Sequence, residues 1–284
     1  MSLIPEDVAP LHDAVLVAAF EGWNDAGDAA SAALEHLLHV WDAHEIAALD
    51  PEGFYDFQVN RPTVRIVEGR REIRWPGVRL HVAAATSMGR PAVLVLGHEP
   101  STNWRGFTGQ LIDAAGRLGV TTIVTLGALL ADVPHTRPIP VSTTSDDATL
   151  RERHAVLSSD YEGPTGIVGV LSDAARRAGI PALSCWAVVP HYAGGPPSPK
   201  ATVALLHRLE QLFEVSIPLG ELVEQASAWE RGVDELAEAD DEVAEYVRTL
   251  ESAADSAQLP DDSGDALARE FERYLRRRGD EPTD

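Results

Sequence analysis

The chain has 284 residues, 44% of them hydrophobic, and its formal net charge is -22 at pH 7. This length is sufficient for one sizeable α/β domain and a smaller appendage. The negative charge excludes nucleic-acid binding, which needs a basic surface, and disfavours contact with anionic membranes. A single cysteine leaves no disulfide within the chain, the first residues lack the pattern of a signal peptide, and no apolar stretch approaches the ~18 residues of a membrane helix. We therefore expect a cytoplasmic protein without membrane segments.

The N-terminal part alternates between predicted strands and helices. An apolar strand at residues 14–20 leads into a helical pattern that continues to Trp41, and Asn24 or Asp25 would cap that helix. Four further strands are predicted at residues 46–49, 64–67, 72–75 and 78–84. The glycine and proline residues between the last three favour a hairpin or meander.

Residues 91–140 form the predicted centre of the fold. An apolar strand at 92–96, an amphipathic helix at 105–118 and a second apolar strand at 121–126 predict a parallel β-α-β unit buried on both faces. In such a unit the loops that follow the strands hold the ligand chemistry. The stretch 142–147 is rich in Ser, Thr and Asp, and we interpret it as a loop too polar for the core.

A helix at 165–178, a strand at 182–189 and a helix at 201–213 continue the alternation. The whole pattern predicts an α/β domain over residues 1–218, with a mixed, largely parallel sheet sandwiched by helices. Residues 219–284 are predicted as an acidic helical appendage, since they contain 20 Asp and Glu against 7 Arg. Their apolar residues follow 4-3 spacing broken at Asp240, which predicts a helical hairpin or one long helix, followed by a short helix around 267–275.

Four predicted strands end in loops that carry polar and aromatic side chains. If these strands are parallel neighbours, the loops meet at one crevice. The candidate cleft residues are Glu21, Trp23, Asp25, His98, Glu99, Trp104, His135, Thr136, Arg137, Tyr161, His191 and Tyr192. In such a cleft a glutamate near aromatic rings would act as a general base, and Arg137 would bind a phosphate or carboxylate through two hydrogen bonds.

Structural roles compete with these chemical ones. His98 and Glu99 would cap the helix that follows them, and Arg137 would bond carbonyl groups across its loop. The histidines considered as zinc ligands are His98, His135 and His191, or His36 with His39. Neither set is complete from spacing alone, so we expect no metal and no cofactor. No phosphate-binding loop, dinucleotide fingerprint or nucleophile elbow is present.

Five collinear motifs over roughly residues 12–215 resemble the proteasome-assembly-chaperone 2 family, most closely its actinobacterial branch. They are Glu21-Gly-Trp-Asn-Asp-Ala-Gly27, Gly97-His-Glu-Pro100 with Trp104, Leu126-Gly127 running to Pro134-His-Thr-Arg-Pro138, Tyr161-Glu-Gly-Pro164, and Val189-Pro-His-Tyr192 with Pro199-Lys-Ala201. The resemblance implies a nucleoside-phosphorylase-like fold and homo-oligomers, with trimers among them. The eukaryotic namesakes are non-catalytic chaperones for assembly of the 20S core. Archaeal relatives that engage the proteasome end in a hydrophobic-Tyr-x tail, which the Glu281-Pro-Thr-Asp284 end of this sequence does not match, so we do not expect docking through it.

Two functions follow as hypotheses. In the first, the chain is a homo-oligomeric, assembly-chaperone-like or protein-interaction protein, suspected to be a trimer, whose protein partner is either related to the proteasome or a different protein. In the second, it is a small-molecule binding protein or an enzyme of hydrolase or phosphorylase type. That function would use the cleft at the carboxyl ends of the strands for a nucleoside or phosphate-type ligand.

Overall fold

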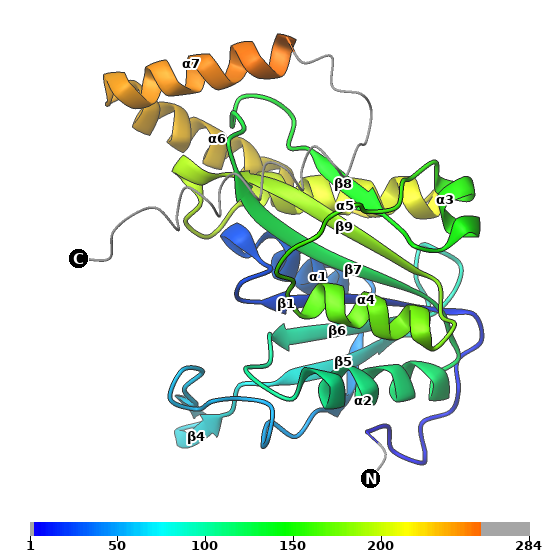
Figure 1. The fold of residues 1–284 in the computed structure, drawn as a ribbon. Coiled ribbons are helices and arrows are strands. Elements are labelled where there is room, and N and C mark those ends of the chain that lie inside the picture. The colour runs from blue at the N-terminus through cyan, green and yellow to red at the C-terminus, as the bar shows by residue number, and fades with distance from the viewer. Residues whose placement is uncertain (1–2, 257–284) are drawn as a thin grey trace.

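The computed structural model describes residues 3–256. Its main sheet has seven strands in the order β2-β5-β6-β1-β7-β9-β8 (Figure 1). The central strands β6, β1, β7 and β9 are parallel, whereas β2, β5 and β8 pair in the antiparallel sense. The bounds are β1 Ala14–Glu21, β2 His44–Ala48, β5 Val78–Ala83, β6 Ala92–His98, β7 Val120–Ala131, β8 Val141–Thr144 and β9 Ala182–Pro190. The predicted mixed, largely parallel sheet is confirmed.

Helices cover both faces of this sheet, as Figure 1 shows. Helices α1 (Ala29–Val40) and α5 (Pro199–Phe213) share one hydrophobic cluster, and α2 (Trp104–Arg117) and α4 (Ile167–Arg177) share the other. Side chains alternate along β1, so that Val15 and Val17 join the first cluster while Leu16 and Phe20 join the second. Burial of both faces explains why the central strands are continuous apolar runs in the sequence.

The predicted β-α-β unit consists of β6, α2 and β7, and its two strands are parallel as expected. A further strand lies between them, because β6 and β7 both pair with β1. Val17 of β1 is opposite Leu94 of β6 on one side and Val124 of β7 on the other. The strand exits that the sequence analysis grouped together are therefore immediate neighbours.

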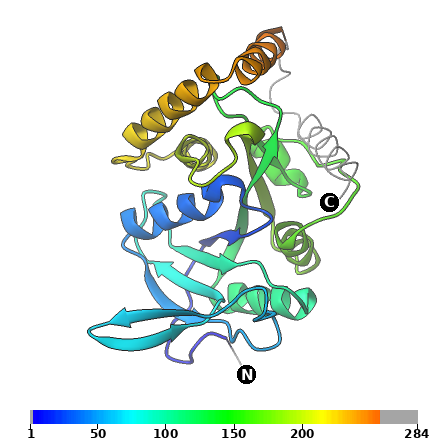
Figure 2. The ribbon, with the colours of Figure 1, turned by 90° about the vertical axis from the view of Figure 1, so that its left-hand side faces the viewer.

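The predicted hairpin is also present, although it stands apart from the main sheet. Strands β3 (Thr63–Val67) and β4 (Arg70–Arg74) pair only with each other. The next strand, β5, pairs with β2 and β6 rather than continuing a meander. Figure 2 shows the hairpin projecting from the body of the molecule.

The prediction that residues 142–147 form a loop outside the core is wrong. They contribute most of β8, an edge strand, where Ser142 and Thr143 are buried. Strand β9 supplies backbone hydrogen-bond partners, and Arg208 Nε donates to Thr143 Oγ1 at 2.7 Å, so the polar atoms are satisfied inside the fold. The side chain of Asp147 then accepts a hydrogen bond from the Leu150 amide and begins α3 (Ala148–His154), a helix absent from the prediction.

Two helices follow α5, namely α6 (Leu222–Glu238) and α7 (Asp241–Ser256). The Asp240 side chain accepts a hydrogen bond from the amide of Glu242 at 2.9 Å, so the residue that interrupts the apolar seam caps the second helix. Both helices lie over the end of the sheet where β7 and β9 finish (Figure 1). The helix predicted around 267–275 lies outside the described residues, and the division at residue 218 stays a prediction. Within residues 3–256, none of the helices has the length and apolar character needed to cross a bilayer.

Candidate functional site

The carboxyl ends of β6, β1, β7 and β9 lie side by side at one edge of the sheet. Glu21 is opposite His98 in the β1–β6 register, and Ala131 is opposite Pro190 in the β7–β9 register. The loops that carry most of the candidate residues leave the sheet from this edge, as parallel neighbours require. Their side chains form two separate groups of contacts, one beside β1 and β6 and the other beside β7 and β9.

The first group, which we call the Glu99 cluster, comprises Glu21, Asn24, His98, Glu99 and Ile167. Glu99 Oε1 accepts hydrogen bonds from Asn24 Nδ2 and from the backbone N–H of Ile167, each at 2.8 Å. Ile167 begins α4, so Glu99 occupies the place that an external anion would take at this helix N-terminus. His98 Nδ1 lies 2.8 Å from Glu21 Oε2, and this hydrogen bond holds the pKa of Glu21 below its ordinary value although burial opposes it. The capping role considered for Glu99 therefore applies to α4 rather than to the helix that follows it in sequence.

Asp25 lies next to this cluster, and its side chain caps the N-terminus of α1. Its Oδ1 accepts hydrogen bonds from the amide groups of Ala30 at 2.6 Å and Ser31 at 3.2 Å. Of the two residues predicted to cap this helix, Asp25 does so and Asn24 bonds to Glu99 instead. Burial raises the pKa of Asp25 to about 6 from its ordinary 3.8, although the bonds from Ser31 and Ala30 oppose the rise.

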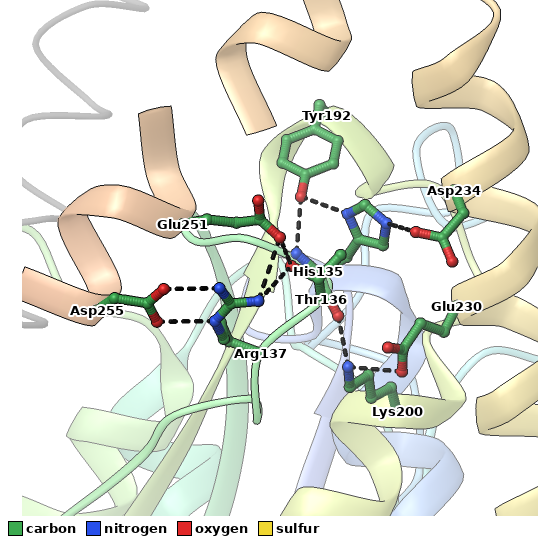
Figure 3. Close-up of polar contacts among 9 residues, drawn as sticks. All are labelled: His135, Thr136, Arg137, Tyr192, Lys200, Glu230, Asp234, Glu251 and Asp255. Carbon is green, nitrogen blue, oxygen red and sulfur yellow. Dashed lines mark hydrogen bonds and ion pairs between the residues drawn. The ribbon is translucent and has the colours of Figure 1, made fainter. Parts of the chain in front are cut away.

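The second group surrounds His135, a side chain that is only 1% exposed (Figure 3). Tyr192 Oη lies 2.8 Å from His135 Nδ1 and also accepts a hydrogen bond from the His135 backbone N–H at 2.7 Å. His135 Nε2 lies 2.9 Å from Asp234 Oδ1 of α6. Burial raises the pKa of Tyr192 to about 12, which keeps it a neutral phenol. Every donor is satisfied once when the phenol donates to Nδ1 and the Nε2–H group donates to Asp234.

The loop after β7, which contains His135, is also held by α7 (Figure 3). Arg137 donates two parallel hydrogen bonds to Asp255, at 2.8 and 2.7 Å, and a third to Glu251 at 3.2 Å. Thr136 donates to the same Glu251 carboxylate. The ion pairs raise the pKa of the Arg137 guanidinium further above its usual range, through the hydrogen bond to Asp255 first. Arg137 thus makes the two-pronged carboxylate contact that its side chain is suited to, with a carboxylate of the same chain.

Lys200 of α5 ties α6 to this loop. Its ammonium group donates to the backbone carbonyl of His135 and pairs with Glu230 of α6 at 2.7 Å. His191 lies 3.1 Å from Asp132, and Tyr246 of α7 donates to the same aspartate at 2.8 Å. We use the name α6–α7 contact for these interactions together with those of His135, Thr136 and Arg137. They join the helices α6 and α7 to the loops that follow β7 and β9. Through them α6 and α7 close the strand-end edge over β7 and β9.

The remaining candidates lie elsewhere. Trp23 and Tyr161 line a cavity of about 410 Å³ on the sheet face beside α4, together with Trp186 and Ser184 of β9. Trp104 begins α2 and donates its indole N–H to the carbonyl of Pro100 at 2.7 Å, so it serves the local fold. The twelve predicted residues are therefore divided among the Glu99 cluster with Asp25, the α6–α7 contact, this cavity and a helix start. In the part of the chain that the structure describes, no three His, Cys, Asp or Glu side chains are placed to hold a metal ion.

Comparison with known proteins assigns the chain to a family. The model of the PAC2 family matches residues 19–237. The chain belongs to the PAC2 family. The family resemblance carried by the sequence motifs is thus confirmed.

Solved PAC2 structures support the assignment. A PAC2 family protein from Streptomyces avermitilis is 56% identical, with a TM-score of 0.77, and the match covers 83% of this chain and 100% of that one. A proteasome-assembly chaperone homologue from Mycobacterium tuberculosis is 50% identical, with a TM-score of 0.75 over 82% and 99% of the two chains. PbaB, an archaeal proteasome activator from Pyrococcus furiosus, shares the fold at 18% identity and a TM-score of 0.65 over 83% and 97%. No protein of curated function matches this chain.

The acidic residues of α6 and α7 that contact the loops after β7 and β9 were not identified from the sequence. The residues concerned are Glu230, Asp234, Glu251 and Asp255, with Lys200 as the basic partner from α5. A usable signal was present, because both acidic pairs are spaced i, i+4 and therefore lie on one helix face. Lys200 is also the single lysine of the chain. Acidic pairs next to an apolar seam indicate a helix that docks on a basic surface, and the basic residues after β7 and β9 provide it.

Proposed function

We propose that this PAC2 protein is a cytoplasmic, homo-oligomeric, assembly-chaperone-like protein that acts by binding other proteins. One observation carries the proposal. The strand-end edge over β7 and β9, where an α/β enzyme of this topology would bind its ligand, is closed by α6 and α7 of the same chain. The groups suited to acid-base or anion chemistry there are bonded to each other.

The Glu99 cluster supports the same conclusion. The helix N-terminus that could receive an anion already binds Glu99, and the imidazole of His98 is paired with Glu21. A ligand at this edge would have to displace internal charges from hydrogen bonds of about 2.8 Å. The similarity to a Mycobacterium tuberculosis proteasome-assembly chaperone homologue supports a proteasome-related partner.

The proposal is tested by assembly of an actinobacterial 20S core from its purified subunits, with and without the full chain. We expect a complex between the chain and free subunits on native gels, and faster appearance of peptidase-active particles. Serum albumin at the same concentration controls for crowding. No complex and no change in assembly rate would refute the assembly role.

A thermal-shift series separates this function from the small-molecule alternative. The probes are adenosine, inorganic phosphate and Mg²⁺, each at millimolar concentration. We expect none of them to raise the melting temperature, because the strand-end groups are occupied. A ligand present at 100 times its Kd would stabilise the protein by about 2.7 kcal/mol, which such an assay detects.

A further inference from the structure

The β3–β4 hairpin is a surface without an internal partner in the described structure. All ten residues of its two strands are exposed, and the strands form a sheet of their own. A two-stranded hairpin is at best marginally stable in water unless it packs against another element. Its projection from the body, seen in Figure 2, therefore points to a contact outside the single chain.

One face of this hairpin is apolar. Val64 pairs with Ile73, and Ile66 pairs with Arg71, so the alternation of side chains places these residues on the same face. Val64, Ile66 and Ile73 are 52%, 66% and 60% exposed. Contiguous aliphatic side chains on the surface of a soluble protein indicate an interaction site.

The hairpin is also basic in an otherwise acidic molecule. Residues 61–74 contain five arginines and two glutamates, a net charge of +3, whereas the whole chain has a net charge of -22. Within residues 3–256, Arg65, Arg70 and Arg71 form no ion pair. A groove of about 450 Å³ at the base of the hairpin is lined by Arg65, Glu72 and Arg74, which lie on the other face of the hairpin. Arg71 lies on the same face as the aliphatic side chains, and an aliphatic face that carries an arginine fits an amphipathic acidic helix.

The outer side of α6 has the matching character. Residues 219–256 contain twelve acidic residues and two arginines, a net charge of -10. Leu236 of α6 is 69% exposed, and Glu235 is exposed on the side of the helix away from the buried Val233 and Ala237. The hairpin and α6 lie at opposite ends of the molecule in both Figure 1 and Figure 2, so they do not meet within one chain.

We propose that the β3–β4 hairpin of one copy binds the outer side of α6 in a second copy of this chain. The inference rests on the homo-oligomeric part of the proposed function. Because the two surfaces differ, the contact is head-to-tail, and its repetition forms a ring when the rotation between successive copies closes. Opposite charge orients the contact, and burial of Leu236 against the aliphatic face of the hairpin stabilises it.

Sedimentation velocity on the full chain, four variants and one control variant tests this contact. We expect an oligomeric wild type, at least tenfold weaker association for Ile66→Glu, and a similar loss for the charge reversals Arg71→Glu and Glu235→Arg made singly. The double variant Arg71→Glu/Glu235→Arg should recover most of the association, because the opposite charges are restored with reversed signs. The control Asp113→Arg changes an exposed residue of α2 and should leave association unchanged.

The outcomes distinguish this inference from the proposal on which it rests. A wild type that is monomeric at high micromolar concentration would overturn both the homo-oligomer and the hairpin contact. An oligomeric wild type whose hairpin and α6 variants keep the same association would overturn the hairpin contact alone. Loss of binding to 20S subunits by Ile66→Glu without dissociation of the oligomer would assign the hairpin to another protein, and would equally overturn the contact with a second copy.

Discussion

The carboxyl group of Asp25 should make the stability of the protein depend on pH. Its pKa is about 6 in the folded protein and 3.8 ordinarily, so the folded state binds the proton more tightly than the unfolded state. For an acid with a raised pKa, this contribution to stability is fully present below about pH 4 and is lost as pH rises through about 6. A difference of about two pKa units, at about 1.4 kcal/mol each, corresponds to about 3 kcal/mol.

The substitution Asp25→Asn isolates this effect. Asparagine is close in size, and its carbonyl oxygen accepts a hydrogen bond from an α1 amide, but it has no charge to bury. We expect the free energy of unfolding of the wild type to fall by about 2 to 3 kcal/mol relative to Asp25→Asn between pH 4 and pH 7. Guanidinium titrations at four pH values and one protein concentration measure this difference.

A matched variant controls for the general effect of removing an acidic charge. Asp113→Asn changes an exposed aspartate on α2 and should shift stability by less than about 0.5 kcal/mol at every pH. If the difference between the wild type and Asp25→Asn stays constant from pH 4 to pH 7, the burial of Asp25 does not impose the charge penalty inferred here.

Two further substitutions test the α6–α7 contact and the packing of the sheet. Arg137→Ala should leave the protein folded but lower the hydrogen-exchange protection of α7, whereas the control Arg248→Ala, on the exposed side of α7, should not; unchanged protection would show that Arg137 does not hold the helix. Gly127→Ala should destabilise the protein by roughly 1 to 3 kcal/mol and shift tryptophan fluorescence, because a Cβ at Gly127 would lie 2.7 Å from the ring of Trp186. Gly109→Ala, in α2 with no atom within 4 Å of the added Cβ, should be neutral or stabilising by up to ~1 kcal/mol, and an equal effect of both glycine substitutions would contradict the close approach of Trp186.

The sequence pattern was sufficient for the central sheet and for most helices. Continuous apolar runs at β1, β6, β7 and β9 have one simple explanation, burial on both faces, and the intervening amphipathic helices require parallel strands. The same logic placed Glu21, His98 and His191 at one edge of the sheet before their neighbours were known. Local periodicity carries this information because both faces of every central strand are in contact with a hydrophobic cluster.

Local periodicity failed where long-range partners supply what the local sequence lacks. β8 reads as a polar loop because its hydroxyl groups are satisfied by Arg208 and by β9, which are distant in sequence. The sequence around His135, Thr136 and Arg137 likewise predicted an open binding site, because the partners of these side chains are distant in sequence. Their carboxylate partners lie roughly a hundred residues later on α6 and α7, and no spacing rule connects a loop to a helix at that separation.

Composition and periodicity thus established the mixed α/β class, the parallel centre and the edge at which polar loops emerge. The resemblance to the PAC2 family rests instead on the five collinear motifs. Whether that edge is open to a ligand or covered by α6 and α7 depended on tertiary contacts. A histidine or arginine has the same sequence pattern whether it faces solvent or a carboxylate of its own chain. Folding brings the acidic residues of α6 and α7 to the basic residues of the strand-end loops. This pairing of charges makes the edge a closed surface rather than a ligand cleft.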